Sequence, residues 1–191
     1  MLFRRLLLVA AWAAAAGAGR AADWPQWRGP DRDDVSKETG LLKAWPDGGP
    51  KLLWTFRDAG AGYSGPAVVG STLYTMGAEG GKEYLYALDL DSRKKVWSAE
   101  VGPVFRDGHG DGPRSTPAVD GGRVYGLGAQ GELVCVERDG GALIWRKNLE
   151  SELGGEMWSE WGYSESPLVD GDRVVCTPGG KKGTLAALDK K

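Results

Sequence analysis

The sequence predicts an all-β protein built from repeated four-stranded antiparallel sheets, and three observations lead to this prediction. Glycine and proline are abundant, with 31 and 10 of the 191 residues, against about 12% together in average usage. Long helices do not tolerate a Gly or Pro every few residues, which excludes helical bundles and coiled coils. A proline-led apolar motif recurs about every 50 residues. Turn sequences such as Asp-Gly and Gly-Gly separate short apolar runs between its copies, as hairpins require.

Three sets of aligned segments define the repeat. The first has the pattern Ser-x-Pro-Ala-Val, or a close variant, and contains Pro66, Pro117 and Pro167. The second resembles Leu-x-Ala-Leu-Asp and occupies residues 84–89, 132–137 and 184–189. The third ends in Trp54, Trp97 and Trp145.

The middle unit shows how the segments become strands. Its apolar runs lie at residues 117–119, 123–127, 133–137 and 142–145, with turn residues between them. Four short runs joined by tight turns predict an antiparallel meander. Meanders repeated at this period form the blades of a β-propeller. A proline can open the first strand of each blade, because that position needs no backbone N–H for the hydrogen-bond ladder of the sheet.

The spacing predicts about three blades, at residues 64–97, 115–145 and 166–191, the last of them incomplete. Propellers have roughly four to eight blades. We therefore expect the chain to be the N-terminal part of a ring of seven or eight blades. Residues 51–56 are expected to be a closing strand that completes a blade supplied by later residues of the same protein.

The repeated tryptophans are interpreted as packing residues between blades. A residue that recurs in every unit serves the repeat, and a buried indole needs a partner for its N–H. The alternative is a set of aromatic side chains that stack on a ligand.

The combination of Ser-x-Pro-Ala-Val-Asp-Gly, Leu-x-Ala-Leu-Asp and a following Trp resembles the PQQ-like (pyrroloquinoline quinone) β-propeller repeat. The motif Asp-Trp-Pro-Gln-Trp-Arg-Gly-Pro at residues 23–30 is similar to the start of secreted bacterial members of that superfamily. The resemblance covers residues 23–191. It implies relatives among the quinoprotein dehydrogenases and the BamB-like outer-membrane assembly lipoproteins, whose functions differ although their fold is shared.

The first 22 residues have the order of a secretory signal peptide. Arg4 and Arg5 precede an apolar run, and small residues follow. An uncleaved anchor helix is the alternative. We expect export to the periplasm or the exterior of a bacterium, no membrane span in the mature chain, and an N-terminal extension at residues 23–50. No lipid-attachment cysteine lies near the cleavage region.

The net charge bears on which class of partner the protein binds, and the cysteine content bears on whether it contains a disulfide. The net charge of −2 gives no support for a nucleic-acid partner. Cys135 and Cys176 both lie in apolar, strand-like runs. They could pair in an oxidising compartment if the fold brought them close, and two buried free thiols are the simpler interpretation.

The candidate binding face consists of the connections between blades, because loops on a rigid scaffold carry sites. These connections span residues 57–63, 103–114 and 150–165. The third is rich in aromatic and acidic residues, which suits stacking on a flat ligand or anchoring a partner. Packing of loops across the channel mouth is the alternative. The candidate residues are Asp107, His109, Asp111, Arg114, Glu156, Trp158, Glu160, Trp161 and Tyr163.

The second connection half matches a calcium-binding loop. Asp107 and Asp111 have the right spacing, but His109 stands where an acid is wanted, and Ala118 stands where a bidentate Glu is needed. A solvated glycine-rich turn explains the segment better. We assign no catalytic residue and no metal ligand, and His109 is the only histidine in the chain.

Two functions from different classes follow. The first is an exported, non-catalytic propeller that binds a protein or envelope partner through the loop face. The second, implied only by the resemblance, is a PQQ-dependent alcohol dehydrogenase with quinone and calcium as cofactors. Enzymes of that kind typically carry two adjacent cysteines against the quinone, and this chain has none.

Overall fold

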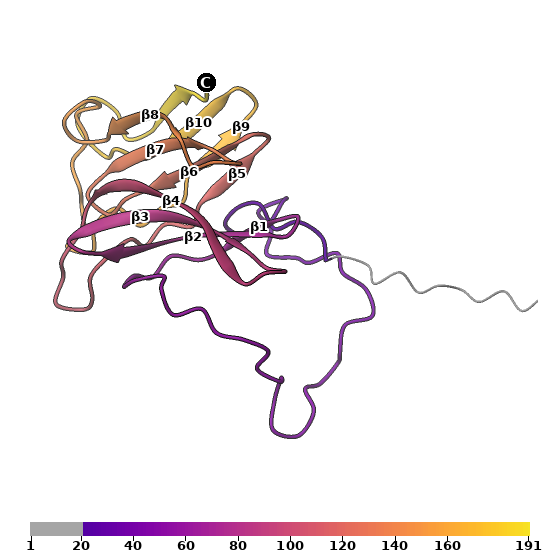
Figure 1. Cartoon of the computed structure of the whole chain (residues 1–191). Coiled ribbons are helices and arrows are strands. Elements are labelled where there is room, and N and C mark those ends of the chain that lie inside the picture. Colours follow the sequence, from indigo (N-terminus) through magenta and orange to yellow (C-terminus); the bar gives the residue numbers. More distant parts are fainter. Residues whose placement is uncertain (1–20) are drawn as a thin grey trace, which may run out of the picture.

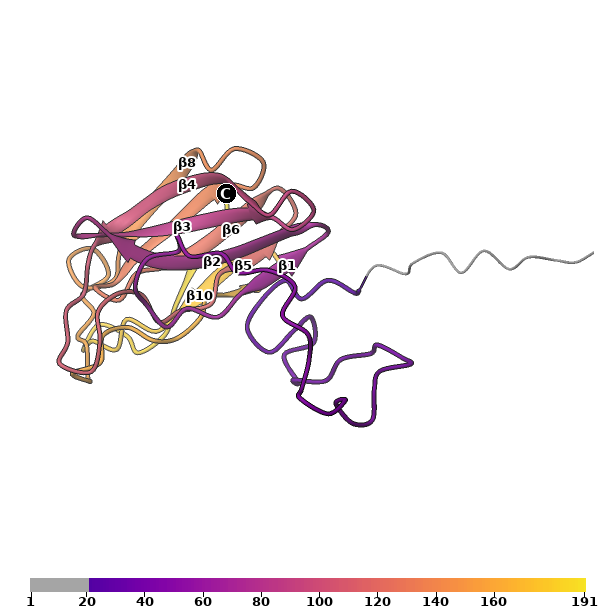
Figure 2. The same cartoon turned by 60° about the horizontal axis from the view of Figure 1, so that its bottom comes forward.

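The computed structural model describes residues 21–191, which form three antiparallel sheets stacked on one another (Figures 1 and 2). The first two sheets have four strands each and the third has three, and in all of them neighbouring strands are consecutive in the chain. The strands are β1 (Ala67–Val69), β2 (Thr72–Glu79), β3 (Lys82–Asp89), β4 (Lys94–Pro103), β5 (Ala118–Asp120), β6 (Arg123–Leu127), β7 (Glu132–Glu137), β8 (Leu143–Asn148), β9 (Leu168–Asp170), β10 (Arg173–Cys176) and β11 (Ala186–Asp189).

Each sheet begins directly after one of the repeated prolines. Strands β1, β5 and β9 start one residue after Pro66, Pro117 and Pro167. Contacts between β1 and β5 and between β5 and β9 place these first strands side by side. They are therefore the innermost strands of successive blades. This arrangement confirms the predicted all-β propeller architecture, of which the described chain is an open part.

The middle sheet buries both of its faces. In β7, Val134 and Val136 belong to a core shared with the first sheet, whereas Leu133 and Cys135 belong to a core shared with the third. Successive side chains of a strand point to opposite faces of the sheet. The hydrophobic core therefore lies in two layers between blades, which fixes how the connecting loops are presented.

The repeated tryptophans of β4 and β8 contact neighbouring blades. Trp97 packs on Tyr74, with ring centroids 5.9 Å apart, and its Nε1 donates a hydrogen bond of 2.9 Å to the Arg138 carbonyl in the next sheet. Trp145 packs on Tyr125 at 6.0 Å and adjoins the core shared with the third sheet. Trp97 therefore joins two blades through a hydrogen bond, whereas the buried Trp145 Nε1 has no hydrogen-bond partner among the described residues and departs from the expectation.

The outer strands extend further than the sequence suggested. The first blade was expected to end at Trp97, but β4 continues to Pro103 because Ala99 and Val101 keep burying side chains in the core. Residues 51–56 belong to no strand of the described chain. Their role as a closing strand stays a prediction, because the partner strands would come from further blades.

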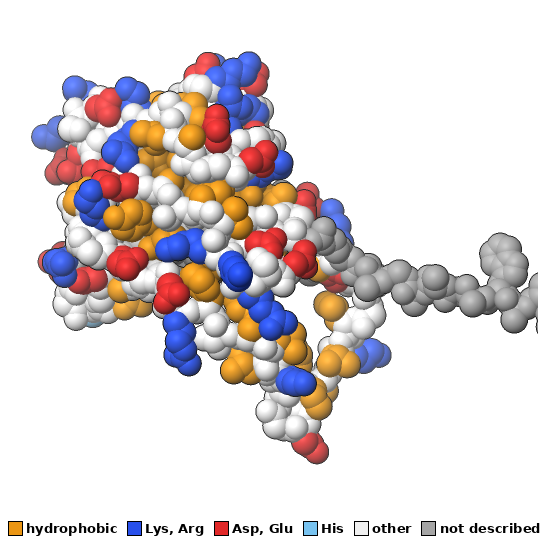
Figure 3. All heavy atoms as spheres, in the orientation of Figure 1, with side chains coloured by type: hydrophobic (Ala, Val, Ile, Leu, Met, Phe, Trp, Pro, Cys, Tyr) orange, Lys and Arg blue, Asp and Glu red, His pale blue; other side chains and the backbone are white. Residues whose placement is uncertain are grey.

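The start of the predicted extension lies against the innermost strands. Trp24 and Val68 exchange two backbone hydrogen bonds of 2.8 Å, and the Val119 N–H donates to the Pro25 carbonyl at 2.8 Å. The chain between this motif and β1 then loops away from the sheets and exposes apolar side chains (Figure 3). Most exposed there are Leu41, Leu42, Trp45, Leu52 and Leu53.

The remaining sequence predictions about the N-terminus fall largely outside the described residues. The signal peptide was assigned to residues 1–22, and the description begins at residue 21. Within residues 21–191, no helix has the length and apolar character needed to cross a membrane.

Candidate binding face

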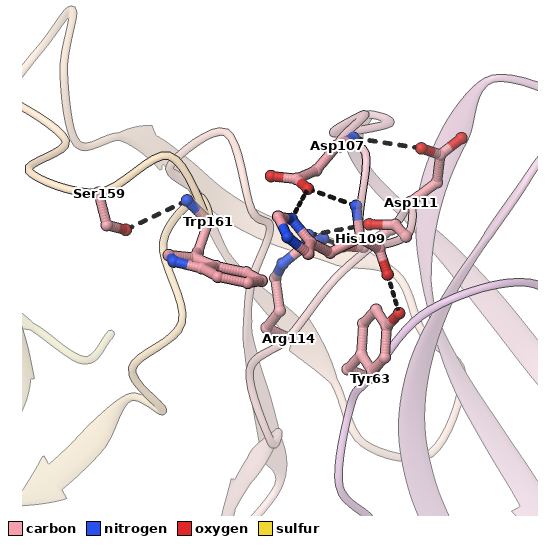
Figure 4. Close-up of polar contacts among 9 residues, drawn as sticks. Tyr63, Asp107, His109, Asp111, Arg114, Ser159 and Trp161 are labelled. Carbon is pink, nitrogen blue, oxygen red and sulfur yellow. Dashed lines mark hydrogen bonds and ion pairs between the residues drawn. The ribbon is translucent and has the colours of Figure 1, made fainter.

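The second and third connections between blades meet through two rings. His109 lies on the connection after β4 and Trp161 on the connection after β8, and their ring centroids are 4.3 Å apart (Figure 4). Both side chains are exposed, Trp161 by 50%. The structure thus brings together residues that the sequence placed 52 positions apart. The shared surface can present a composite aromatic contact to a partner.

Asp107 holds the tip of the second connection in a compact turn. Its Oδ1 accepts hydrogen bonds from the backbone N–H of His109 at 2.7 Å, and it lies 2.8 Å from His109 Nδ1. The backbone hydrogen bond, followed by the contact with the His109 ring, lowers the pKa of the Asp107 carboxyl. Asp111 forms an ion pair with Arg106, in which Asp111 Oδ2 lies 2.7 Å from Arg106 Nη1. The two predicted acidic residues are therefore used within the loop.

Asp107 and Asp111 do not belong to a larger cluster of potential metal-binding side chains within the described residues. No group of three or more His, Cys, Asp or Glu side chains that could hold a metal lies within residues 21–191. Cys135 and Cys176 are buried free thiols, so the simpler of the two interpretations holds. Burial raises the pKa of each thiol to about 11.

Arg114 closes the second connection against the first. Its guanidinium donates to the Gly110 carbonyl at 2.9 Å and to the Gly112 carbonyl, and it lies over the rings of Phe105 at 4.7 Å and Tyr63 at 5.6 Å. The Tyr63 hydroxyl donates to the His109 carbonyl at 2.5 Å. One arginine and one tyrosine thus fasten two connections together (Figure 4).

A buried carboxyl group supports this face from below. Glu83 of β3 is fully buried, and its two oxygens accept the backbone N–H groups of Phe105 at 3.1 Å and Ala129 at 2.9 Å. Burial raises the pKa of this carboxyl. Glu83 was not a candidate from the sequence, because a charged residue in an alternating strand looks like a solvent-facing position.

The third connection divides its aromatic residues between core and surface. Tyr163 is only 5% exposed and donates from its hydroxyl to the Pro178 carbonyl at 3.2 Å. Trp158 is 84% exposed, although its Nε1 donates to the Gly179 carbonyl at 2.6 Å. Glu156 and Glu160 are exposed. Of the predicted aromatic candidates, Trp158 and Trp161 are therefore exposed at the surface, and Tyr163 is buried beneath the loop.

Three cavities open on this face. One of about 450 Å³ lies beside Trp158, between the third connection and residues 177–184. A second of about 440 Å³ lies at the ends of the innermost strands, and its walls include Trp27, Arg32 and Glu165. A third of about 290 Å³ is lined by Tyr63, His109, Arg114, Trp161 and Ser164.

Trp27 and Arg32 line the second cavity but were not candidates from the sequence. Trp27 lies under the guanidinium groups of Arg28 and Arg32, which are 5.3 and 5.7 Å from its ring centroid. The motif at residues 23–30 was recognised only as a family signature. Nothing in the sequence alone shows that it folds back onto the ends of the innermost strands.

The stacked blades define a β-propeller repeat protein, and its loops form a candidate binding face at one end of the innermost strands. A family model described as "Outer membrane protein assembly factor BamB" matches residues 81–191. The chain belongs to this family, and its propeller repeat is of the PQQ-like type.

Individual proteins are similar to parts of this chain. A BamB from Pseudomonas aeruginosa is 36% identical over 69 residues, which cover 36% of this chain and 17% of that protein. The quinohemoprotein alcohol dehydrogenase of Comamonas testosteroni has a similar structure, with a TM-score of 0.63 and 19% identity over 92% of this chain and 27% of its own. BamB from Moraxella catarrhalis gives a TM-score of 0.41 at 20% identity, over 65% of this chain and 32% of its own. The chain therefore spans about a quarter of the dehydrogenase and a smaller part of the Pseudomonas protein.

Proposed function

We propose that this protein is an exported, non-catalytic binding or scaffold module of the bacterial envelope, and that it holds a protein partner through the loop face. The observation that carries the proposal is the exposed aromatic pair formed by His109 and Trp161 across two blades. Large aromatic side chains on a rigid support are the usual anchors of protein interfaces. Membership of the BamB family favours a role in assembly with other proteins over a role that needs no protein partner.

The rigidity of this surface supports a binding role. Glu83, Arg114 and Tyr63 hold the connections through hydrogen bonds to backbone groups. A surface ordered before binding loses less conformational entropy when a partner docks. The nearby Trp158 extends the aromatic surface, because its indole is pinned by one hydrogen bond while its faces stay exposed.

Capture of envelope proteins by the tagged full-length protein tests the proposal. We expect Trp161→Ala and Trp158→Ala each to lower recovery of the partner about tenfold, as the loss of an interface anchor does. Trp45→Ala is the matched control, since Trp45 is 68% exposed but lies on the protruding N-terminal segment. Equal recovery with all three variants would exclude this face as the anchor.

The alternative, oxidation of an alcohol with PQQ and calcium, rests on similarity of fold at 19% identity. Fold similarity of this degree carries no activity with it. Adding quinone and Ca²⁺ to the full-length protein tests this alternative directly. Quinone absorbance together with dye-linked alcohol oxidation would establish the enzyme and replace the scaffold proposal.

A further inference from the structure

Two of the cavities form one groove with two chemically different ends. The cavity of about 440 Å³ and the cavity of about 290 Å³ share Tyr63, Arg114 and Ser164 as lining residues. The larger cavity reaches Arg32, and the smaller one reaches His109 and Trp161. We call this combined depression the mouth groove.

The floor of the mouth groove is built by the repeat itself. Gly65, Thr116 and Ser166 each precede one of the repeated prolines, and all three line the larger cavity. The Thr116 N–H donates to Ser166 Oγ at 2.9 Å, which ties the second blade to the third. A side chain at Gly65 would collide with Thr116 Oγ1, 2.5 Å from an added Cβ. The fold therefore sets how closely the blades approach one another at this floor.

The larger cavity of the groove is lined by two guanidinium groups that have no ion-pair partner within the described residues. Arg28 is paired with Asp34 at 2.6 Å, but neither Arg32 nor Arg114 forms an ion pair within the described residues. Burial, and then the charge of Arg28, lower the pKa of Arg32. Glu165 also lines the cavity, and its Oε1 accepts the Thr177 N–H at 3.0 Å. The residues that line the larger cavity thus include two guanidinium groups and one carboxylate, an excess of one positive charge.

The other end of the groove is aromatic. Tyr63 and Trp161 are 60% and 50% exposed, and the Trp161 ring is set against His109. Arg114 lies where the two ends meet, as Figure 4 shows beside Trp161 and Tyr63. An aromatic side chain of a ligand can lie on these rings while a neighbouring carboxylate reaches the guanidinium groups.

We propose that the mouth groove binds an extended peptide segment of a partner protein in which Asp or Glu stands next to an aromatic residue. The carboxylate pairs with Arg32 and Arg114, and the aromatic side chain packs on Trp161 and Tyr63. This inference rests on the proposed binding function and specifies the segment that is bound. The groove has a positively charged compartment beside an aromatic one. This arrangement matches two neighbouring side chains of one peptide better than it matches a single compact anion.

Fluorescence polarisation with labelled peptides and the full-length protein tests the proposal. We expect Gly-Asp-Phe-Asp-Gly to bind at least about tenfold more tightly than Gly-Asn-Phe-Asn-Gly and Gly-Asp-Ala-Asp-Gly. An acid on both sides of Phe makes the result independent of chain direction. Binding should weaken as salt is raised, since charged partners are screened.

Variants locate the contacts. Arg32→Gln should remove the preference for Asp over Asn, and Trp161→Ala should remove the preference for Phe over Ala. Lys94→Gln is the control: it makes the same change in charge at the start of β4 and should alter neither of these two preferences. Equal binding of the three peptides, no binding of any, or the same preferences in Arg32→Gln would overturn the proposal. Full displacement of the labelled peptide by free benzoate at the same concentration would also overturn the proposal, because it would indicate a site for small anions.

The result of the peptide experiment can be distinguished from the result of the capture experiment that tests the proposed function. If Trp158→Ala and Trp161→Ala lower capture of the partner while the peptides show no preference, the loop face binds a partner of other chemistry. If the peptides show the preference and capture is unchanged by both substitutions, the groove binds acidic segments but does not anchor the envelope partner.

Discussion

Two tryptophans, Trp97 and Trp161, separate the two kinds of region in this molecule. Trp97 stands at a repeated position in β4, and its N–H is bonded to the next blade at 2.9 Å. Trp161 stands in a connection, is half exposed and touches a histidine from a different blade. The same side chain therefore joins sheets in one region and forms a surface in the other. Repeated residues pack the blades of the propeller, and we propose that unrepeated residues of the connections carry recognition.

The largest effect on stability is expected from Trp97→Ala. The substitution removes the contact with Tyr74 and the hydrogen bond to Arg138. Truncation of a large aromatic core residue costs about 3–5 kcal/mol, and partial burial places this one at about 3 kcal/mol. Chemical denaturation of the full-length protein measures the loss. A change below about 0.5 kcal/mol would show that this tryptophan does not join the blades.

A smaller loss of stability is expected from Glu83→Gln. The carboxylate accepts two N–H groups with its two oxygens, whereas the amide has one acceptor oxygen and would turn a donor toward the other N–H. An unsatisfied buried donor costs about 1–3 kcal/mol. Denaturation should show a loss of about 2 kcal/mol, with faster amide exchange at Phe105 or Ala129. Unchanged exchange at both amides would contradict this supporting role.

The smallest effect is a dependence of stability on pH. Burial raises the pKa of the carboxyl groups of both Glu83 and Glu132 above the ordinary value of 4.5. The folded protein then binds more protons than the unfolded chain between that value and the raised ones, so stability falls as pH rises through this interval. Glu132 contributes through its buried Oε2, which has no hydrogen-bond partner.

Thermal unfolding across this pH range, compared with the Glu132→Gln variant, measures the effect. The variant should show a shallower fall of Tm, because one of the two titrating groups is gone. Glu152→Gln is the control, since Glu152 is exposed and paired with Lys147, and its pKa is lowered mainly by that pairing. An identical slope in Glu132→Gln and the wild type would exclude Glu132 as a source.

The fold was predictable from the sequence because its signals are local and repeated. Pro66, Pro117 and Pro167 mark the starts of three innermost strands, and the turn glycines mark the hairpins. The end of β4 was less predictable, since burial of Ala99 and Val101 depends on the neighbouring blade. Periodicity shows where strands recur but not how far each one runs.

The candidate face was predictable only in part. The second and third connections stood out because the repeat does not explain them, and His109 and Trp161 do meet. The buried position of Tyr163 and the supporting role of Glu83 were not predictable, because each depends on a backbone group far away in the sequence. The same holds for Trp27 and Arg32, which reach the face only through the folding back of the N-terminal motif.

Trp97→Ala and Trp161→Ala, assayed side by side for unfolding free energy and for binding of the acidic aromatic peptide, test the division of roles most directly. We predict that Trp97→Ala loses about 3 kcal/mol of stability while its folded fraction binds normally. Trp161→Ala should stay within about 0.5 kcal/mol of the wild type and bind at least about tenfold more weakly. Loss of both properties in both variants, or loss of binding in Trp97→Ala alone, would contradict the account.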